Sequence, residues 1–306
     1  MTSKFLDLID QVDNVAYDYD YADFYRLLLP NDTRTHGFMT QETVQKMPWT
    51  KDFKIDHEAR FVRLNLPPSA GPAAVNKAFQ EVIDAAVEGD KFEVLHGDHS
   101  EPYIVQGVDY PLHIERFTAP LFGIATRGAH MTAYTRTASG EIKIWVARRS
   151  PHLFTYPGKL DTTVAGGVKA HHTPFQCIVE ESEEEAALER DLVSKTVRHV
   201  GVITYMTKSK RSGAVHPDVL FLFDIELPES VVPRPNDGEV SEFKLLTVDE
   251  IKEAMFAGEF KANCNLVMID FFIRHGILTP ENEQDYVQLQ TRLHRKIPIP
   301  TSPREK

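Results

Sequence analysis

The segment that most constrains the fold is residues 164–188, VAGGVKAHHTPFQCIVEESEEEAAL. A pair of glycines opens it, a short polar loop follows, and Pro174 suits the first turn of a helix. That helix carries a dense run of glutamates, namely Glu180, Glu181, Glu183, Glu184, Glu185 and Glu189. The segment therefore predicts a glycine loop that leads into an acidic helix.

Helical spacing assigns these side chains to faces. One face is predicted to be largely apolar and consists of Phe175, Val179, Ser182 and Ala186. Glu181, Glu184 and Glu185 stand at i, i+3 and i+4, where like charges repel by a few tenths of a kcal/mol per pair. A divalent cation with oxygen ligands would offset that repulsion. A solvated charged face is the alternative.

These residues resemble the Nudix box, which has a glycine, a glutamate six residues later and an Arg-Glu-apolar-x-Glu-Glu-x-Gly ending. Glu181, Glu184 and Glu185 match its last three glutamates, and Gly166 or Gly167 matches its opening glycine. In the family, the arginine helps to orient the catalytic glutamates. Four positions depart from the box, where glutamate, arginine, an apolar residue and glycine are replaced by His172, Glu180, Ser182 and Ala187.

Composition limits the class of protein. The chain has 306 residues, 42% of them hydrophobic and 26% charged, as in a soluble globular protein of one large or two ordinary domains. A net charge of -11 argues against general nucleic-acid binding, although a bound cation allows a small phosphorylated substrate. The two cysteines, Cys177 and Cys264, form no CxxC pair, so neither zinc nor a disulfide framework is expected.

Residues 1–112 predict a small α+β module without a nucleotide loop, a metal-ligand cluster or a nucleophile motif. The segment from Pro30 to Pro48, followed by ARFVRL, resembles the N-terminal module of one Nudix subgroup, which implies a part in shaping the substrate pocket. The expected elements are helices over 3–15 and 21–29, a helix capped at Thr40, a strand or a hairpin over 53–66, a helix over 72–87 and short strands over 91–116.

Residues 113–280 predict a second domain. Strands are expected over 129–136 and 141–148, followed by the acidic helix, two further strands, a helix that Thr247 caps and a helix that stops at Gly276. This order predicts an α/β/α sandwich around a mixed sheet, which is also the Nudix fold. Residues 281–306 are expected to hold a C-terminal helix and a disordered Pro-rich tail.

Several segments of this half narrow the resemblance to one subgroup of Nudix hydrolases. They are RGAHMTAYTR, IKIWVARRS, YPGKLDTTVAGGV, HPDVLFLFDIELP and PNDGEVSEFKLL. Together they resemble the thiamin pyrophosphokinase-related Nudix hydrolases of fungi and plants, over nearly the whole chain. The resemblance implies hydrolysis of thiamin diphosphate, or of its oxidised analogues, to the monophosphate and phosphate.

Such chemistry requires metal ligands and groups that bind phosphate. Mg²⁺ or Mn²⁺ is the expected cofactor, because it activates water and neutralises phosphate oxygens. The predicted ligands are the backbone carbonyl of Gly166 and the carboxylates of Glu181, Glu184, Glu185 and Glu239, with Glu242 an alternative to Glu239. Any of the helix glutamates could also act as the base. The predicted phosphate-binding cations are Arg148, Arg149, Lys208, Lys210 and Arg211.

Two other functions remain open. The substitutions at Glu180, Ser182 and Ala187 fit a protein that senses a thiamin or nucleotide diphosphate without efficient hydrolysis, and an ADP-ribose-type hydrolase is a further alternative. The expected partner is a small diphosphate, with no nucleic acid and no membrane, for a monomer or homodimer. The acidic N-terminal segment lacks the character of a targeting sequence, so a cytoplasmic or nuclear location is expected.

Overall fold

Alternating apolar residues in the second half of the chain build a large central sheet. The computed structural model describes residues 3–67, 69–95 and 101–304 and orders five strands as β11-β12-β7-β8-β13, with β10 beside β7 and β9 beside β8. β12 runs parallel to β7 and the other pairs are antiparallel. The strands are β7 (Thr126–Arg136), β8 (Ile142–Arg149), β9 (Leu160–Asp161), β10 (Val164–Gly167), β11 (Arg198–Lys208), β12 (Val215–Glu226) and β13 (Val240–Thr247).

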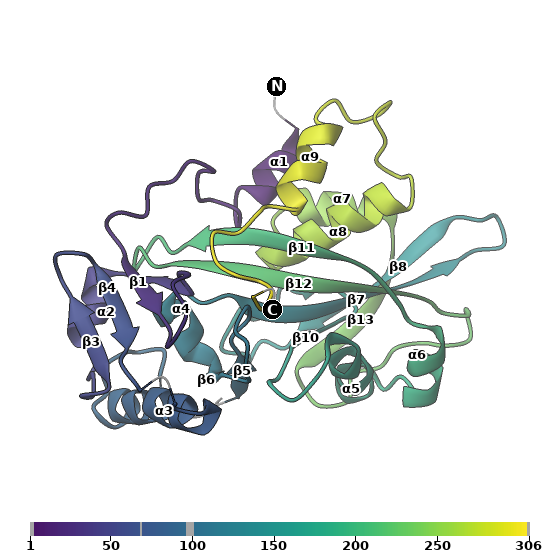
Figure 1. Ribbon diagram of the computed structural model, residues 1–306. Helices are drawn as coiled ribbons and strands as arrows, with labels where there is room; N and C mark the ends of the chain where they lie inside the picture. Colours follow the sequence, from purple (N-terminus) through teal and green to yellow (C-terminus); the bar gives the residue numbers. More distant parts are fainter. Residues whose placement is uncertain (1–2, 68, 96–100, 305–306) are drawn as a thin grey trace.

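Helices cover both faces of this sheet (Figure 1). On one face lie α5 (Pro174–Ala186) and α6 (Arg190–Thr196), and on the other lie α1 (Lys4–Ile9), α7 (Val248–Phe256), α8 (Ala262–Arg274) and α9 (Tyr286–Leu293). Successive side chains of a strand point to opposite faces. Met131 and Phe223 therefore pack in the cluster around α5 and α6, whereas Leu222 packs in the cluster around α8. The α/β/α sandwich predicted from the sequence is confirmed.

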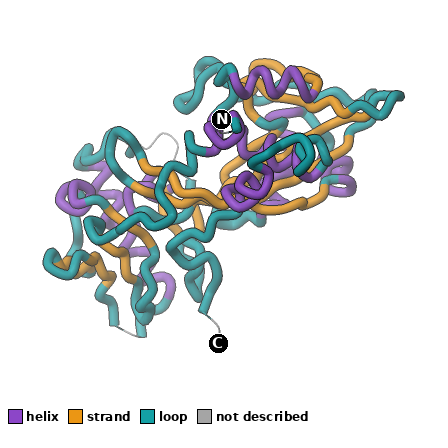
Figure 2. Tube along the Cα trace, turned by 90° about the horizontal axis from the view of Figure 1, so that it is seen from above, coloured by secondary structure: helices purple, strands orange, loops and turns teal. Residues whose placement is uncertain are grey.

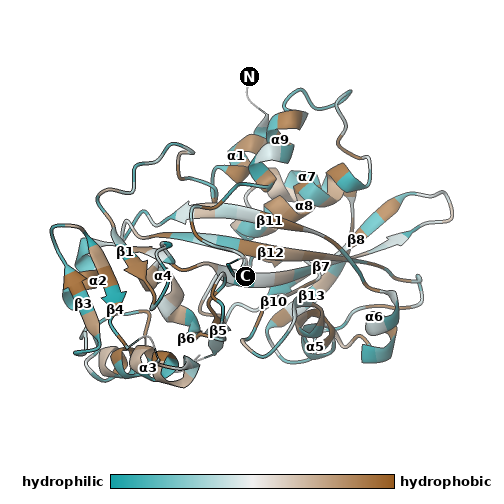
Figure 3. Cartoon of the chain, in the orientation of Figure 1, coloured by the Kyte–Doolittle hydropathy of each residue, from teal (hydrophilic) through white to brown (hydrophobic). Residues whose placement is uncertain are grey.

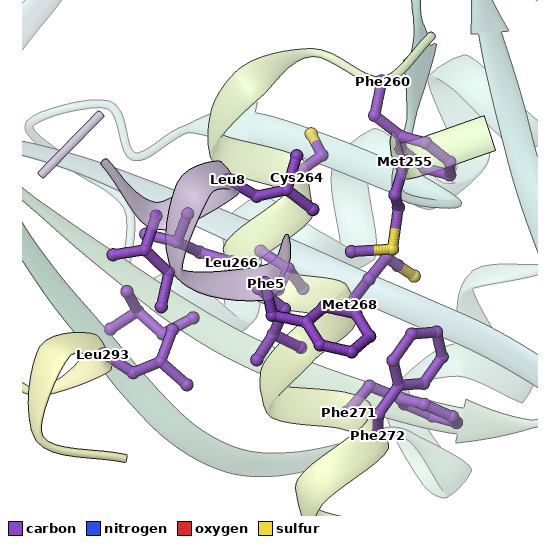
Figure 4. Packing of buried hydrophobic residues seen from close by; sticks show 14 of the residues in the cluster. Phe5, Leu8, Met255, Phe260, Cys264, Leu266, Met268, Phe271, Phe272 and Leu293 are labelled. Atoms are coloured by element: carbon purple, nitrogen blue, oxygen red, sulfur yellow. The ribbon is translucent and has the colours of Figure 1, made fainter. Parts of the chain in front are cut away.

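Helix α1 packs against the C-terminal helices, although it comes first in the sequence. Figure 4 shows Phe5 and Leu8 of this helix among side chains of α8, including Leu266 and Met268. Ser3 caps the helix by accepting a hydrogen bond from the backbone N–H of Phe5. The chain therefore starts on the larger lobe before it enters the smaller one. The domain limits 1–112, 113–280 and 281–306 stay a prediction.

The N-terminal lobe is a four-stranded sheet, ordered β2-β1-β4-β3, with helix α3 packed against it (Figures 1 and 2). Its elements are β1 (Tyr25–Leu28), β2 (Gly37–Met39), α2 (Gln41–Lys46), β3 (Phe53–Asp56), β4 (Phe61–Leu64) and α3 (Pro72–Glu88). The predicted hairpin, the long helix and the Thr40 cap are confirmed. The helix predicted over 21–29 is wrong, because β1 instead pairs with β2 and β4. Pairing between strands overrides a local amphipathic pattern.

A short connecting region belongs to the same lobe and leads to the central sheet, since Val105, Leu112 and Ile114 are buried in the same cluster as Phe79 of α3. It consists of β5 (Pro102–Ile104), β6 (His113–Glu115), the 3₁₀ helix η1 (Arg116–Thr118) and α4 (Ala119–Phe122). Figure 3 shows apolar residues concentrated along α8 and polar residues on α6, in keeping with their burial. Among the described residues, no helix has the length and hydropathy of a membrane span.

The C-terminal tail is ordered over its described residues, contrary to the prediction of disorder. Ile297 and Ile299 are buried in a cluster with Phe24 and Met206, which joins the two lobes. Arg304 donates to the Asp109 carboxylate, with Nε 2.7 Å from Oδ2. Apolar burial by the two isoleucines overrides the composition of a Pro-rich segment.

A buried carboxylate fastens this tail to the larger lobe. Asp13 is fully buried and accepts hydrogen bonds from Arg295 Nη1 at 2.9 Å and from Arg292 Nε at 2.9 Å. We expect Asp13→Asn to lower the free energy of unfolding by about 3 kcal/mol, because it leaves Arg295 buried without its counter-charge. Asp10→Asn is the control, since Asp10 is exposed and also pairs with Arg292. Equal midpoints of chemical denaturation for the two variants would contradict this assignment.

Candidate functional site

A cavity of about 410 Å³ lies where the central sheet, α5 and the N-terminal lobe meet. Strand β7 supplies one wall, with Arg127 and Gly128, and α5 supplies another, with Glu181 and Glu185. Tyr103 and its neighbours close the side that faces the N-terminal lobe. Residues from both lobes therefore enclose one space.

Local interactions fix the start of α5 beside β10. Thr173 caps the helix by accepting from the backbone N–H of Gln176 at 3.2 Å, and the Gln176 side chain accepts from the backbone N–H of Thr173 at 2.9 Å. This reciprocal pair is a capping box. It sets the helix so that Glu185 Oε2 accepts from the backbone N–H of Ala165 in β10 at 3.2 Å.

The face of α5 predicted from spacing is only partly buried. Ser182 and Ala186 are buried as expected, but Phe175 is 41% exposed, so that part of the prediction is wrong. Cys177 and Ile178 are also buried. By helical spacing Phe175 lies on the same side as Ser182 and Ala186, so its exposure comes from its place in the first turn of the helix.

The three predicted helix glutamates do not lie in equivalent places. Glu181 and Glu185 line the cavity, whereas Glu184 is exposed and is not among the described residues that line it. Glu184 is still close enough for its charge to raise the pKa of Glu181. Glu239, which comes from the loop before β13, lines the same cavity.

Gly166 lies directly against the Glu181 carboxylate. A Cβ atom added at Gly166 would come within 2.6 Å of Glu181 Oε1 and 2.7 Å of its Cδ. Gly166 pairs in register with Ala129 of β7, so the strand cannot move away without breaking the sheet. The glycine therefore provides the room in which Glu181 packs.

Burial and crowding shift the protonation of both cavity glutamates. Burial raises the pKa of Glu181 to about 7, and the charges of Glu184 and Glu239 add to that shift. Burial also raises the pKa of Glu185 well above its ordinary value, with a further contribution from Glu181. Crowded buried carboxylates beside a strand carbonyl form the oxygen-rich donor set that Mg²⁺ or Mn²⁺ prefers, and a cation would offset their repulsion. These residues fit the expected metal.

A second cluster of possible metal ligands is better described as an ion-pair network. His130, Asp161 and Cys264 are buried and offer ligand atoms within 4.8 Å of one another. Asp161 Oδ2 is, however, 3.1 Å from Arg149 Nη1 and 3.4 Å from Lys261 Nζ. Burial alone would raise the pKa of Asp161, but the Lys261 charge beside it helps to hold that pKa well below its usual range. The two cations leave little charge there for a divalent ion to neutralise.

Two departures from the box contact each other. His172 Nδ1 is 3.2 Å from Glu180 Oε2, and Lys169 Nζ is 3.4 Å from Glu180 Oε1. His172 stands where the box has glutamate and Glu180 where it has arginine. Glu180 of the helix therefore contacts two residues of the preceding loop, His172 and Lys169.

Only one of the five predicted phosphate-binding cations lines the cavity, and it is Arg149. Arg148 Nε donates to Glu242 Oε1 at 2.8 Å, away from the described lining. The remaining three predicted cations are also outside the described lining, at the end of β11 that faces the N-terminal lobe. They are Lys208, Lys210 and Arg211. Other lining residues were not predicted as site residues, because the fold alone brings them together. They include Tyr103, Arg116, Arg127, Asp218 and Lys261, of which Arg127 and Asp218 lie in the segments RGAHMTAYTR and HPDVLFLFDIELP that carry the resemblance.

We expect Gly166→Ala to weaken Mn²⁺ binding at least about tenfold, because the added methyl group displaces the Glu181 carboxylate. Isothermal titration calorimetry of the purified protein measures this directly. Gly71→Ala is the control, since Gly71 lies outside the cavity, has φ of -77° and has open space around it. Unchanged affinity in Gly166→Ala would remove Glu181 from the metal site.

We also expect Mn²⁺ to stabilise the protein more at pH 8 than at pH 6. The folded-state pKa of Glu181 is about 7, above its ordinary 4.5, so the metal-free protein loses stability as pH rises through that window. Below pH 7 the cation must displace a proton, which lowers its affinity by up to about tenfold per unit. Thermal unfolding with and without Mn²⁺ at both pH values tests this, and Glu181→Gln should flatten the difference. The same Mn²⁺-induced shift in the unfolding temperature at both pH values would refute it.

Comparison with known proteins agrees with this geometry. The model of the NUDIX domain matches residues 126–264. An uncharacterised protein of Saccharomyces cerevisiae is 33% identical over 97% of this chain and 92% of its own length. Nudix hydrolase 20, chloroplastic, of Arabidopsis thaliana is 38% identical over 77% of this chain, which spans 62% of that relative. A crystal structure from Deinococcus radiodurans aligns with a TM-score of 0.42 and 21% identity, over 56% of this chain and 98% of its own.

The matched residues 126–264 contain the glycine strand β10, the acidic helix α5 and the loop that carries Glu239. The likeness to the yeast protein extends over almost the whole chain, N-terminal lobe included. These matches show that the chain contains a NUDIX domain and that it is similar to Nudix hydrolases of Arabidopsis thaliana.

Proposed function

We propose that this protein is a metal-dependent hydrolase of thiamin diphosphate or of its oxidised analogues, with the monophosphate and phosphate as products. The observation that carries the hydrolase proposal is the buried pair Glu181 and Glu185, which borders a cavity that cations also line. The thiamin-type substrate is supported by the resemblance of five segments, from RGAHMTAYTR to PNDGEVSEFKLL, to the thiamin-related subgroup.

In the proposed reaction, a water oxygen bonds to the terminal phosphorus as the bridging P–O bond breaks. The monophosphate leaves with the bridging oxygen, and the proton of the water passes to one of the cavity carboxylates. Mg²⁺ or Mn²⁺, when bound, lowers the pKa of the water and neutralises phosphate oxygens. Glu181, Glu185 and the Gly166 carbonyl would hold the ion, with Glu239 reaching it from the loop before β13. Glu184 is also part of the proposed metal site, because its charge raises the pKa of Glu181.

The cavity suits an organic diphosphate that carries a flat ring. Its volume of about 410 Å³ lies in the range of small-molecule sites. Aromatic rings prefer to stack on flat heterocycles or to meet them edge to face. The aromatic side chains of the lining are Tyr103, Phe117, Tyr156 and Tyr205.

A sensor that binds the diphosphate without cleaving it is the second candidate. The exchanged pair His172 and Glu180 is the observation that favours it, because the family's arginine is replaced by an acid. The same pair nevertheless ties the loop to the helix, so the groups that would hold the metal keep their support. We therefore favour the hydrolase.

A substrate panel with matched variants tests the proposal. With Mn²⁺, we expect phosphate release from thiamin diphosphate or an oxidised analogue, and slower or no turnover of ADP-ribose. Glu185→Gln and Glu181→Gln should lower kcat by at least about 100-fold, since each removes a carboxylate that would hold the metal ion beside the reacting phosphate. Glu184→Gln should have a smaller effect, because that side chain is exposed.

Glu183→Gln is the matched control, because Glu183 is exposed on the same helix and pairs with Arg190. Its rate should equal that of the wild type. Tight binding of a panel member with no product formed would support the sensor instead.

A further inference from the structure

We propose that Arg127, together with Arg116 and Tyr103 from the region before the matched NUDIX residues, forms a subsite that binds a phosphate group of the substrate. This inference rests on the proposed function, because it assigns the diphosphate to a place in the same cavity. It also gives the N-terminal lobe a direct part in binding.

Arg127 is partly buried, and its guanidinium is incompletely paired. Its Nε and Nη2 atoms are buried, and within the described chain neither has a hydrogen-bond partner. Burial lowers the pKa of its guanidinium, as expected for a charge removed from water. An unpaired buried charge is costly to keep, and an anion in the cavity would pair with it.

The position of Arg127 places it beside the glycine strand. Its backbone oxygen accepts a hydrogen bond from the backbone N–H of Val168 at 3.0 Å, and the next residue, Gly128, is paired with Gly167 of β10. The strand that carries Arg127 therefore runs alongside the Gly166–Gly167 pair. The acidic groups of α5 contact the same glycine strand through Glu181 and Glu185.

Tyr103 reaches this place from the other lobe. Its hydroxyl occupies the space that a Cβ atom at Gly167 would fill, so only glycine leaves room for it. The docking is secured by the backbone, since Ala170 N–H donates to the Pro102 oxygen at 2.7 Å and Tyr103 forms a β-bridge with Lys169. Burial raises the pKa of Tyr103 to about 12, so its hydroxyl keeps its proton and can donate.

Arg116 lies over Tyr103 at the start of η1. Its guanidinium carbon is 5.7 Å from the centre of the Tyr103 ring, and its Nη1 is 3.3 Å from Glu101 Oε2. All three side chains line the cavity. Two guanidinium groups and a hydroxyl present the donors that phosphate oxygens accept.

Other cations of the cavity are less suitable. Arg149 and Lys261 both pair with Asp161, at 3.1 Å and 3.4 Å, so their charge is already offset. The Arg127 guanidinium, with two buried nitrogens that lack a partner in the described chain, gains more from an incoming phosphate than either of them. The observed pairing thus favours Arg127 as the centre of the subsite.

Binding of methylenediphosphonate, which is not hydrolysed, tests the subsite without turnover. With Mn²⁺ present, isothermal titration calorimetry should show that Arg127→Met weakens binding about 10- to 100-fold and that Tyr103→Phe and Arg116→Gln each weaken it about 3- to 10-fold. The controls are Arg198→Met, which loses an exposed arginine of β11, and Tyr134→Phe, whose hydroxyl donates to Glu226 outside the described lining. Both should bind like the wild type.

The stability of the ligand-free protein separates binding from a merely structural role. Arg127→Met should raise Tm by a few degrees, because the variant no longer buries an incompletely paired charge. A structural arginine would give the opposite sign. Arg127→Lys keeps the charge but loses the planar guanidinium, so it should bind the probe more weakly than wild type without the gain in Tm.

The subsite and the proposed function fail in different experiments. If the wild type does not bind methylenediphosphonate, or if the three variants bind it as well as the wild type, the subsite is refuted even when hydrolysis of the panel is observed. If the variants lose binding while no panel member is hydrolysed, the subsite stands and the hydrolase proposal is wrong.

Discussion

The contact between the acidic helix α5 and the glycine strand β10 is the constraint on which the site depends. Gly166 leaves room for the Glu181 carboxylate, and Ala165 donates its backbone N–H to Glu185. Both carboxyls are held where burial opposes their ionisation. A protein maintains such an arrangement at a cost in stability, which a bound cation offsets.

The departures from the family's box are easier to understand in three dimensions. In the sequence, His172 replaces the glutamate of the box and Glu180 replaces its arginine. In the structure the two side chains meet, and Lys169 joins them. Glu180 therefore links the helix to the loop through His172 and Lys169, so its presence alone does not indicate a degenerate site.

The N-terminal lobe is part of the functional cavity. Strand β5 docks on the loop after β10 through backbone hydrogen bonding, which places Tyr103 against Gly167. A cluster that contains Phe24, Met206 and Ile297 joins the lobes over a second area. Two contacts far apart in sequence limit the relative motion of the lobes, and the cavity between them depends on both. The C-terminal tail, with its isoleucines, contributes to the same joint.

Sequence alone determined the features that depend on short-range order. The strands β7 and β8, the caps at Thr40 and Thr247 and the layered sandwich follow from periodicity and capping, which need only neighbouring residues. The acidic helix and the glycine before it were also readable, and Glu181 and Glu185 do face the cavity.

Only the tertiary structure decided the rest. Strand β1 was predicted as a helix because pairing with β4 involves residues about 35 positions away along the chain, and no local pattern encodes that pairing. Glu184 is exposed because it lies on the side of α5 that faces away from the sheet, and Phe175 is exposed because it lies in the first turn of the helix. Arg116, Arg127 and Tyr103 lie on separate elements, and no local pattern in the sequence groups them. They come together because the two lobes pack against each other. That packing depends on many weak contacts between residues that are far apart in the sequence.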